Sequence, residues 1–149
     1  MNKYIGVKII EATPAQKHTC TKNDCAEGID GYKVVYPQPD GSTYESWSPK
    51  DVFEESYRLT SGMTFGLAIE ALKKGYKVAR SGWNGKGMWL ILQTDSEVTL
   101  REGTCYHKAG LKHVKIDPHI DMFTAAGTMQ PGWLASQADI LSDDWQIIK

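Results

Sequence analysis

The sequence predicts an α+β fold, in which a small, mostly antiparallel sheet carries one main helix and follows a smaller β-hairpin and helix module. Two observations support this fold class. Residues 64–72 contain one apolar stripe at helical spacing, and several short segments with strand-like patterns follow it. A helix followed by a run of short strands, without regular alternation of the two, is typical of α+β proteins.

The composition narrows the class of function. The chain has 149 residues, 41% hydrophobic content and a net charge of -1, without a run of like charges. A protein that binds nucleic acid by neutralising phosphates normally has a basic face, so that class is disfavoured. No apolar stretch approaches the roughly 20 residues of a membrane span, and the N-terminus lacks the apolar core of a signal peptide. We therefore expect a soluble, cytoplasmic protein.

The cysteines and histidines do not predict a metal site. Two cysteines have C-x4-C spacing, whereas structural zinc sites favour tighter ligand pairs, and the third cysteine has no partner pair. Reduced thiols on loops explain them better in a cytoplasmic protein. We expect no metal and no cofactor. The residues considered are Cys20, Cys25, Cys105, His107, His113 and His119.

The first unit, residues 1–60, is predicted to hold three strands and a short helix. Apolar residues alternate over residues 4–10, which predicts a strand, and residues 32–36 and 43–47 flank a turn at 39–42, which predicts a hairpin. Ser48 is the expected helix N-cap, with Pro49 at the first helical position and Asp51 three residues after the cap.

The second unit, residues 62–149, follows a junction at 59–62. Its helix is expected to begin at the cap Thr64 and to end at Gly75. Strands are predicted at residues 77–80, 88–93, 98–101, 119–124 and 145–148. Ser136 and Asp139 match a capping box, which predicts one helical turn before the last strand.

Two tryptophans lie in predicted loops of the second unit. Residues 81–88 read SGWNGKGM and contain Trp83, and residues 131–139 read PGWLASQAD and contain Trp133. Tryptophan more often lies within an apolar run, whereas these two are surrounded by glycine, amide and hydroxyl groups. Such surroundings suit a pocket for a planar, polar, phosphate-bearing small molecule, and no catalytic arrangement lies nearby.

The glycine-rich loop has two interpretations. Asn84 and Gly85 tolerate positive φ and predict a tight turn, with Trp83 packed beneath it. Alternatively, the backbone N–H groups of the loop bind anionic oxygens and Lys86 adds a charge-assisted contact. The chemistry of the residues alone does not separate the two.

The second segment also has a structural and a functional interpretation. Ser136 and Asp139 are expected to cap each other's backbone, and Gln137, which has no capping role, is available to contact a base or a ribose. Asp143 and Asp144 do not predict a catalytic dyad, because neighbouring residues of a strand point to opposite faces.

Three segments together resemble a known family. They are residues 63–75 (MTFGLAIEALKKG), 80–88 (RSGWNGKGM) and 132–145 (GWLASQADILSDDW). In this order they resemble the Thoeris anti-defence family of the second type, small phage proteins, and the resemblance covers about residues 62–149. It implies a homotetramer with ligand sites between protomers. It also implies a sponge for cyclic ADP-ribose-type signals of bacterial immunity and, in some members, for cyclic dinucleotides.

The resemblance implies a binding protein and not an enzyme, so no catalytic residue is assigned. The expected ligand contacts lie in the two tryptophan segments and in the strand at 119–124. They are Trp83, Asn84, Gly85, Lys86, Gly87, Met122, Thr124, Trp133, Ser136, Gln137 and Asp139. The first 60 residues resemble a small module found beside phage accessory proteins, for which no function is implied.

The chain departs from the family pattern at several positions. Phe123 stands where a basic residue is expected, Ala126 where an aspartate is expected, and Ser142 where alanine is commoner. The segment 94–118 is long for the family. These departures concern the identity of the ligand more than the fold.

Two other functions remain open. One is an enzyme that degrades the same nucleotides, with His107, His113 or His119 as acid or base. The other is a module that binds a host defence enzyme, with exposed tryptophans as anchors. A sponge releases intact ligand on denaturation, an enzyme releases product, and a protein-binding module releases neither.

Overall fold

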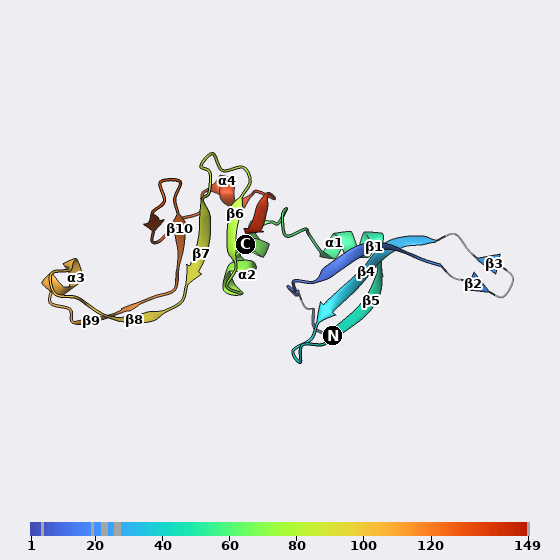
Figure 1. Cartoon of the computed structure of the whole chain (residues 1–149), viewed down its shortest axis with the longest axis horizontal. Coiled ribbons are helices and arrows are strands. Elements are labelled where there is room, and N and C mark those ends of the chain that lie inside the picture. Colours follow the sequence, from blue (N-terminus) through green and yellow to red (C-terminus); the bar gives the residue numbers. More distant parts are fainter. Residues whose placement is uncertain (4, 19, 22–23, 26–27, 149) are drawn as a thin grey trace. The chain divides into compact units, whose positions relative to one another are not determined.

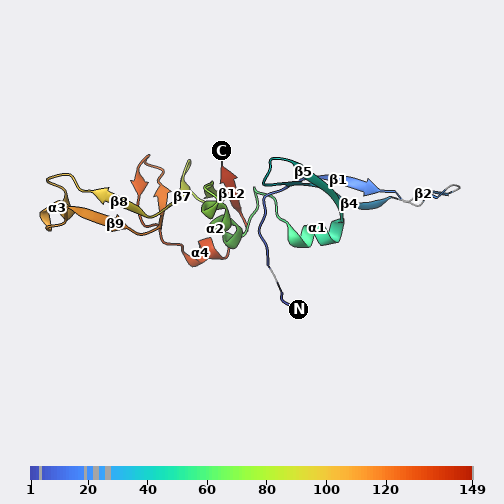
Figure 2. The same cartoon turned by 90° about the horizontal axis from the view of Figure 1, so that it is seen from below.

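The computed structural model describes residues 1–3, 5–18, 20–21, 24–25 and 28–148, and it divides into two compact units, Met1–Arg58 and Leu59–Lys149. Helices and mostly antiparallel strands coexist in the described residues, which confirms the predicted α+β class (Figures 1 and 2). None of the described helices is long and apolar enough to cross a membrane.

The first unit is built on a three-stranded antiparallel sheet with the order β1–β4–β5. Its strands are β1 (Glu11–Lys17), β4 (Ile29–Pro37) and β5 (Thr43–Pro49), and β5 leads into α1 (Lys50–Ser56). Two short strands, β2 (Cys20–Thr21) and β3 (Asp24–Cys25), pair beyond the ends of β1 and β4. The predicted hairpin is confirmed as β4 and β5, and its turn contains Gly41 at φ +83°.

Two predictions for this unit are wrong. The expected strand at 4–10 is absent from its described residues, among which Ile5 is 99% exposed, and Tyr4 lies outside the description. The first strand of this unit is β1 instead. Pro14 lies in the middle of β1, and proline is unfavourable in most strands, but it is tolerated here because β1 is an edge strand. The helix begins after Pro49, and Ser48 belongs to β5 and caps no helical N–H group.

Gly31 brings β4 and the Trp47 side chain together. A Cβ atom at Gly31 would lie 2.5 Å from the Trp47 ring and 2.3 Å from the backbone oxygen of Ser48. The indole therefore rests on bare backbone, with its Nε1 donating to the Ala15 oxygen at 3.4 Å. On the sheet face that α1 covers, Tyr32 stacks on Phe53, with ring centroids 4.1 Å apart.

The second unit is a five-stranded sheet with the order β11–β10–β7–β6–β12. Its strands are β6 (Lys77–Arg80), β7 (Trp89–Gln93), β10 (His119–Phe123), β11 (Met129–Gln130) and β12 (Trp145–Ile148). Helix α2 (Phe65–Lys73) packs on one face, over β6, β7 and β12. Alternate strand residues, such as Val78, Leu90 and Trp145, form the core beneath it.

Local signals located the main helix correctly. The Thr64 hydroxyl accepts a hydrogen bond from the Leu67 N–H group, and Gly75 follows the last turn at φ +85°, as expected for a helix that ends at glycine. The strands predicted at 77–80 and 145–148 have the bounds of β6 and β12. The capping box of α4 (Gln137–Ile140) is also confirmed.

Residues 94–118, which we call the arm, form a separate hairpin segment of the second unit. It contains the hairpin of β8 (Ser96–Thr99) and β9 (His113–Ile116), with α3 (Cys105–Lys108) between the two strands (Figure 1). The sequence predicted a strand at 98–101, two residues late, and neither α3 nor β9. Cross-strand pairing of residues 96–99 with 113–116 sets this register, and pairing at that separation leaves no local signal.

Candidate functional site

Both predicted loop tryptophans pack into one aromatic cluster of the second unit. The ring centroids of Trp83 and Trp133 lie 6.2 Å apart, and those of Trp83 and the fully buried Trp145 lie 5.4 Å apart, both edge to face. Phe65 of α2 completes the cluster, 5.5 Å from Trp145. Trp83 and Trp133 remain half-buried, so each offers only part of its ring surface to a ligand.

A partly buried cation, Arg80, lies beside this cluster and is flanked by two carboxylates. Arg80, at the end of β6, donates from Nη1 to Asp139 Oδ1 at 2.9 Å and from Nε to Asp144 Oδ1 at 2.8 Å. The Arg80 and Asp139 side chains are 15% and 12% exposed, so water screens this pair weakly. One cation faces two anions, and the group of three carries a net charge of -1.

Asp139 holds the two tryptophan segments together. Its Oδ1 accepts from Arg80 and, at 3.0 Å, from the Trp83 indole Nε1, while its Oδ2 accepts from the backbone N and the hydroxyl of Ser136. Ser136 Oγ in turn accepts from the Asp139 N–H group. The polar atoms of Asp139 and the Ser136 hydroxyl are thus engaged within the protein, as the capping-box interpretation expects.

These contacts set the ionisation of both acids. Burial alone would raise the pKa of Asp139, but hydrogen bonds from Ser136, Trp83 and Arg80 outweigh it and lower the pKa to about 2. The pKa of Asp144 lies even further below its usual range, first through its hydrogen bond from Arg80 and then through Ser142 and the Gly82 N–H group. Both groups are carboxylates at neutral pH and are poor proton donors.

The depressed pKa of Asp139 predicts an acid-sensitive fold. Because its folded pKa of about 2 lies below the usual 3.8, the stabilisation is complete above pH of about 5 and is lost as the pH falls toward 2. We expect this group to contribute about 2 kcal/mol across that range. Urea unfolding at pH 7, 4 and 2.5 measures it. A variant Asp139→Asn should lose the share of the pH dependence that Asp139 contributes, whereas the share of Asp144, whose pKa is also lowered, should remain. An identical acid slope in that variant would contradict the assignment.

The glycine-rich loop at 81–88 is anchored at one end and open at the other. Asp144 Oδ2 accepts from the Gly82 N–H group at 2.6 Å and from the Ser81 hydroxyl at 3.3 Å. Asn84 and Lys86 are exposed, and within the described part of the chain their side chains have no hydrogen-bond or ion-pair partner. The exposed ammonium of Lys86 is therefore available to an anionic ligand.

The turn predicted from Asn84 and Gly85 is wrong in its backbone geometry. Neither residue has positive φ; Gly87 adopts it instead, at +72°. Gly85 is needed for space, because a Cβ there would lie 2.5 Å from Met88 Sδ and 3.1 Å from Ala125 Cβ. The loop spans eight residues and rests on the β10–β11 turn, so the two-residue geometry that favours positive φ at both positions does not apply.

The remaining predicted contacts are dispersed. Met122 packs against the hydrophobic core of the second unit. The Thr124 hydroxyl bonds to that of Thr128 at 2.8 Å and closes the β10–β11 turn. Gln137 is exposed, with no side-chain partner among the described residues. The structure thus joins Trp83, Trp133, Ser136 and Asp139, with Lys86 and Gln137 exposed in the same two segments.

Arg80 and Asp144 are structural members of this site that the sequence analysis did not assign. Arg80 stands opposite Trp145 in the β6–β12 ladder, and 59 residues separate it from Asp139. The sequence feature that could have identified Arg80 is its position as a basic residue at the end of a predicted strand, just before a glycine-rich loop. Among the departures from the family pattern, Ser142 donates to Asp144 Oδ1 at 2.6 Å, and Phe123 stacks on Trp89 with centroids 5.0 Å apart.

The predicted catalytic alternatives find little support in the geometry. His107 and His113 lie on the arm, and His113 Nδ1 contacts the Thr99 hydroxyl at 3.3 Å. His119 bonds to the Asp117 oxygen through Nδ1, and its Nε2 lies 3.3 Å from Asp121. Among the residues described, no three histidine, cysteine, aspartate or glutamate side chains are grouped as metal ligands would be. The side chains of Cys20 and Cys25 lie outside the description.

Comparison with known proteins gives two findings. A family model described as a Thoeris anti-defense 2-like domain matches residues 63–148. A protein of Bacillus phage SP01, named Thoeris anti-defense 2, is 35% identical over 90 residues, which make up 60% of this chain and 99% of that protein. The residues matched by the family model include the arm.

Proposed function

The chain belongs to the Thoeris anti-defense 2-like family, and from this we propose that it binds cyclic ADP-ribose-type signal nucleotides and sequesters them without cleavage. In this proposal the protein acts in the cytoplasm of the infected cell and thereby prevents activation of the Thoeris effector. Cyclic dinucleotides are included as further ligands of the same sequestering role.

This proposal rests mainly on one observation, which is that hydrogen bonds to Asp139 hold the two tryptophan segments together. This arrangement brings together the half-buried rings of Trp83 and Trp133, and the loop that contains Trp83 also carries the exposed Lys86. An aromatic surface suits a nucleobase, and backbone N–H groups with one ammonium suit phosphate oxygens. The Arg80 group, with its net charge of -1, disfavours phosphates on its own side. We therefore expect the phosphates to lie at the Lys86 end.

We propose that the bound nucleotide is not cleaved, because the acidic side chains of the site already accept hydrogen bonds from other groups of the protein. Asp139 accepts four hydrogen bonds and Asp144 is paired with Arg80, so neither is available to activate water or to protonate a leaving group. The same contacts make the site rigid, and a rigid site binds without the entropic cost of ordering its own side chains.

We also propose a homo-oligomer, with four chains and ligand sites between protomers. Large aliphatic side chains lie exposed in and near the Trp133 segment: Leu134 is 89% exposed, Leu141 76% and Ile140 40%. Exposed apolar patches of this kind usually mark an interface. A second copy that covers them would also lie next to the Trp133 segment. Native mass spectrometry with a panel of cyclic nucleotides tests both points at once, because it reports the oligomer size and the mass of the retained ligand. Monomers without ligand would overturn the proposal.

Binding is expected to depend only weakly on salt. Lys86 is the exposed cation of the loop, and the chain as a whole carries a net charge of -1. Few counterions are then released when the ligand binds. Between about 50 and 500 mM salt, affinity for a cyclic ADP-ribose signal should fall by less than about a hundredfold. Isothermal titration calorimetry measures this, and Lys86→Gln should reduce the slope. A steeper loss would reveal a basic surface assembled across chains.

A further inference from the structure

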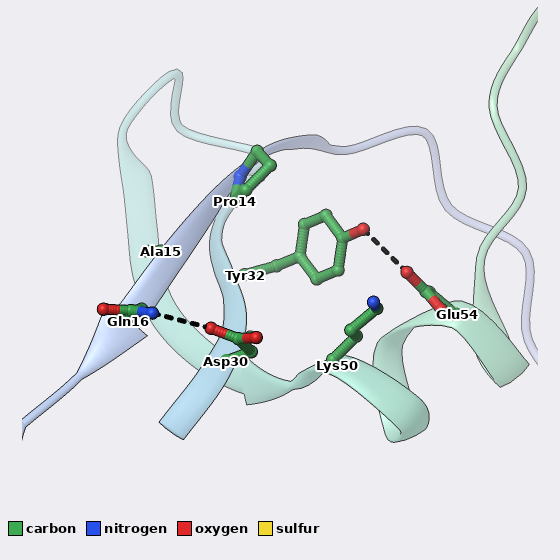
Figure 3. A pocket seen from close by; sticks show the side chains of 8 residues that line it. Pro14, Ala15, Gln16, Asp30, Tyr32, Lys50 and Glu54 are labelled. Carbon is green, nitrogen blue, oxygen red and sulfur yellow. Dashed lines mark hydrogen bonds between the residues drawn. The ribbon is translucent and has the colours of Figure 1, made fainter. Parts of the chain in front are cut away.

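The first unit contains a cavity of about 450 Å³ that is separate from the family domain. It lies between β1, β4 and the first turns of α1, and Figure 3 shows its side chains around the Tyr32 ring. The strand register creates it, because Gln16 stands opposite Asp30 and Pro14 opposite Tyr32 in the β1–β4 ladder. Residues of α1 close the third side, and they include Lys50 and Glu54.

Charged groups with unused hydrogen-bonding capacity converge on this cavity. Asp30 Oδ1 accepts from Gln16 Nε2 at 2.9 Å, and Glu54 Oε1 accepts from the Tyr32 hydroxyl at 2.9 Å. Within the part of the chain that the structure describes, the second oxygen of each carboxylate and the Lys50 ammonium have no partner. Two anions and one cation thus leave a net charge of -1, which favours a cationic guest.

The walls of the cavity suit a methylene chain. Pro14, Ala15 and the Tyr32 ring line it with carbon. Stacking on Phe53 holds the ring in place, and the hydrogen bond to Glu54 raises the pKa of the Tyr32 phenol, so the hydroxyl stays protonated and keeps this bond. An apolar stem with a cationic head complements carbon walls with carboxylates beyond them.

The exposure of the lining side chains indicates which kind of ligand the cavity can bind. Most of its lining side chains, including those of Pro14, Asp30 and Lys50, are exposed, whereas sites for free small molecules enclose most of the ligand. A side chain presented by another polypeptide needs no such enclosure. A guanidinium, with its planar fork of donors, can bond two carboxylates at once, which an ammonium does less well.

We propose that the cavity formed by Asp30, Tyr32 and Glu54 binds an arginine side chain of a partner polypeptide. Lys50 then acts against binding, because its ammonium lies in the same cavity as the guest cation. The proposal therefore predicts opposite effects on affinity: removal of the Asp30 or Glu54 charge weakens binding, whereas removal of the Lys50 charge strengthens it.

The test uses the full chain and N-acetyl-L-arginine amide as the probe, followed by NMR chemical shifts. We expect binding with a dissociation constant on the order of 1 mM, as suits a few exposed charged contacts. The shifts should centre on Gln16, Asp30 and Tyr32. Asp30→Asn and Glu54→Gln should each weaken binding about two- to fivefold, and Lys50→Met should strengthen it by a similar factor. Glu55→Gln, on the same helix but outside the cavity, is the matched control and should change nothing.

Three outcomes would overturn the proposal. The first is equal binding of the neutral isostere N-acetyl-L-citrulline amide, and the second is equal weakening in Glu55→Gln. The third is a markedly tighter complex with free L-arginine, which would point to a free amino acid as the guest. None of these results bears on nucleotide binding, which is measured on the same samples, so failure here leaves the sequestration proposal intact.

Discussion

Replacement of Asp139 by alanine is expected to lower the free energy of unfolding by about 2–4 kcal/mol, because several partly buried hydrogen-bond donors lose their acceptor. The substitution leaves the Arg80 guanidinium with one carboxylate in place of two. It also removes the acceptor for the Trp83 indole and for the Ser136 backbone. Urea denaturation of the full chain measures the loss.

Asp143→Ala is the matched control for Asp139. It removes an exposed acid four residues along the chain that has no partner in the described structure, and it should change the unfolding free energy by less than about 0.5 kcal/mol. If Asp139→Ala cost no more than Asp143→Ala, the hydrogen bonds to Asp139 would not organise the site.

Trp83→Ala is expected to weaken binding of a cyclic ADP-ribose signal about tenfold or more, since an aromatic stacking contact contributes about 1–3 kcal/mol per base. Trp83 also packs edge to face on Trp133 and Trp145 and bonds to Asp139. We therefore also expect a loss of about 2–3 kcal/mol in unfolding free energy.

A second variant separates the two effects of Trp83. Trp83→Phe keeps a ring in the aromatic cluster and removes the indole donor to Asp139. It should retain most of the stability and much of the affinity if the ring surface contacts the ligand. Calorimetry on samples shown to be folded by circular dichroism gives the answer. Unchanged affinity in a folded Trp83→Ala protein would leave Trp83 with a structural role alone.

The elements that the sequence predicts well are those whose signals are local. The apolar stripe of α2, its Thr64 cap and its terminal Gly75 lie within a dozen residues of one another, and so do the partners of the Ser136–Asp139 box. Such signals depend on backbone hydrogen bonds between near neighbours, which a single sequence displays.

The features that the sequence did not predict depend on contacts between distant residues. Strand β1 exists because residues 11–17 pair with residues 29–35, and its own composition argues against a strand. Arg80 gains its role from acids 59 and 64 residues away. The loop tryptophans were placed correctly outside the strands, but the burial of their rings against Trp145 depends on how β6 and β12 pair.

The most direct test of sequestration is the fate of the bound nucleotide. A cyclic ADP-ribose signal is incubated with excess protein until it no longer activates the effector, the protein is then denatured by heat, and the released material is analysed by mass spectrometry. If the protein only sequesters the signal, we expect the signal to be recovered intact, in an amount close to that added, and to activate the effector again. Recovery of a cleaved or hydrolysed nucleotide would contradict this expectation and would show that the protein is an enzyme.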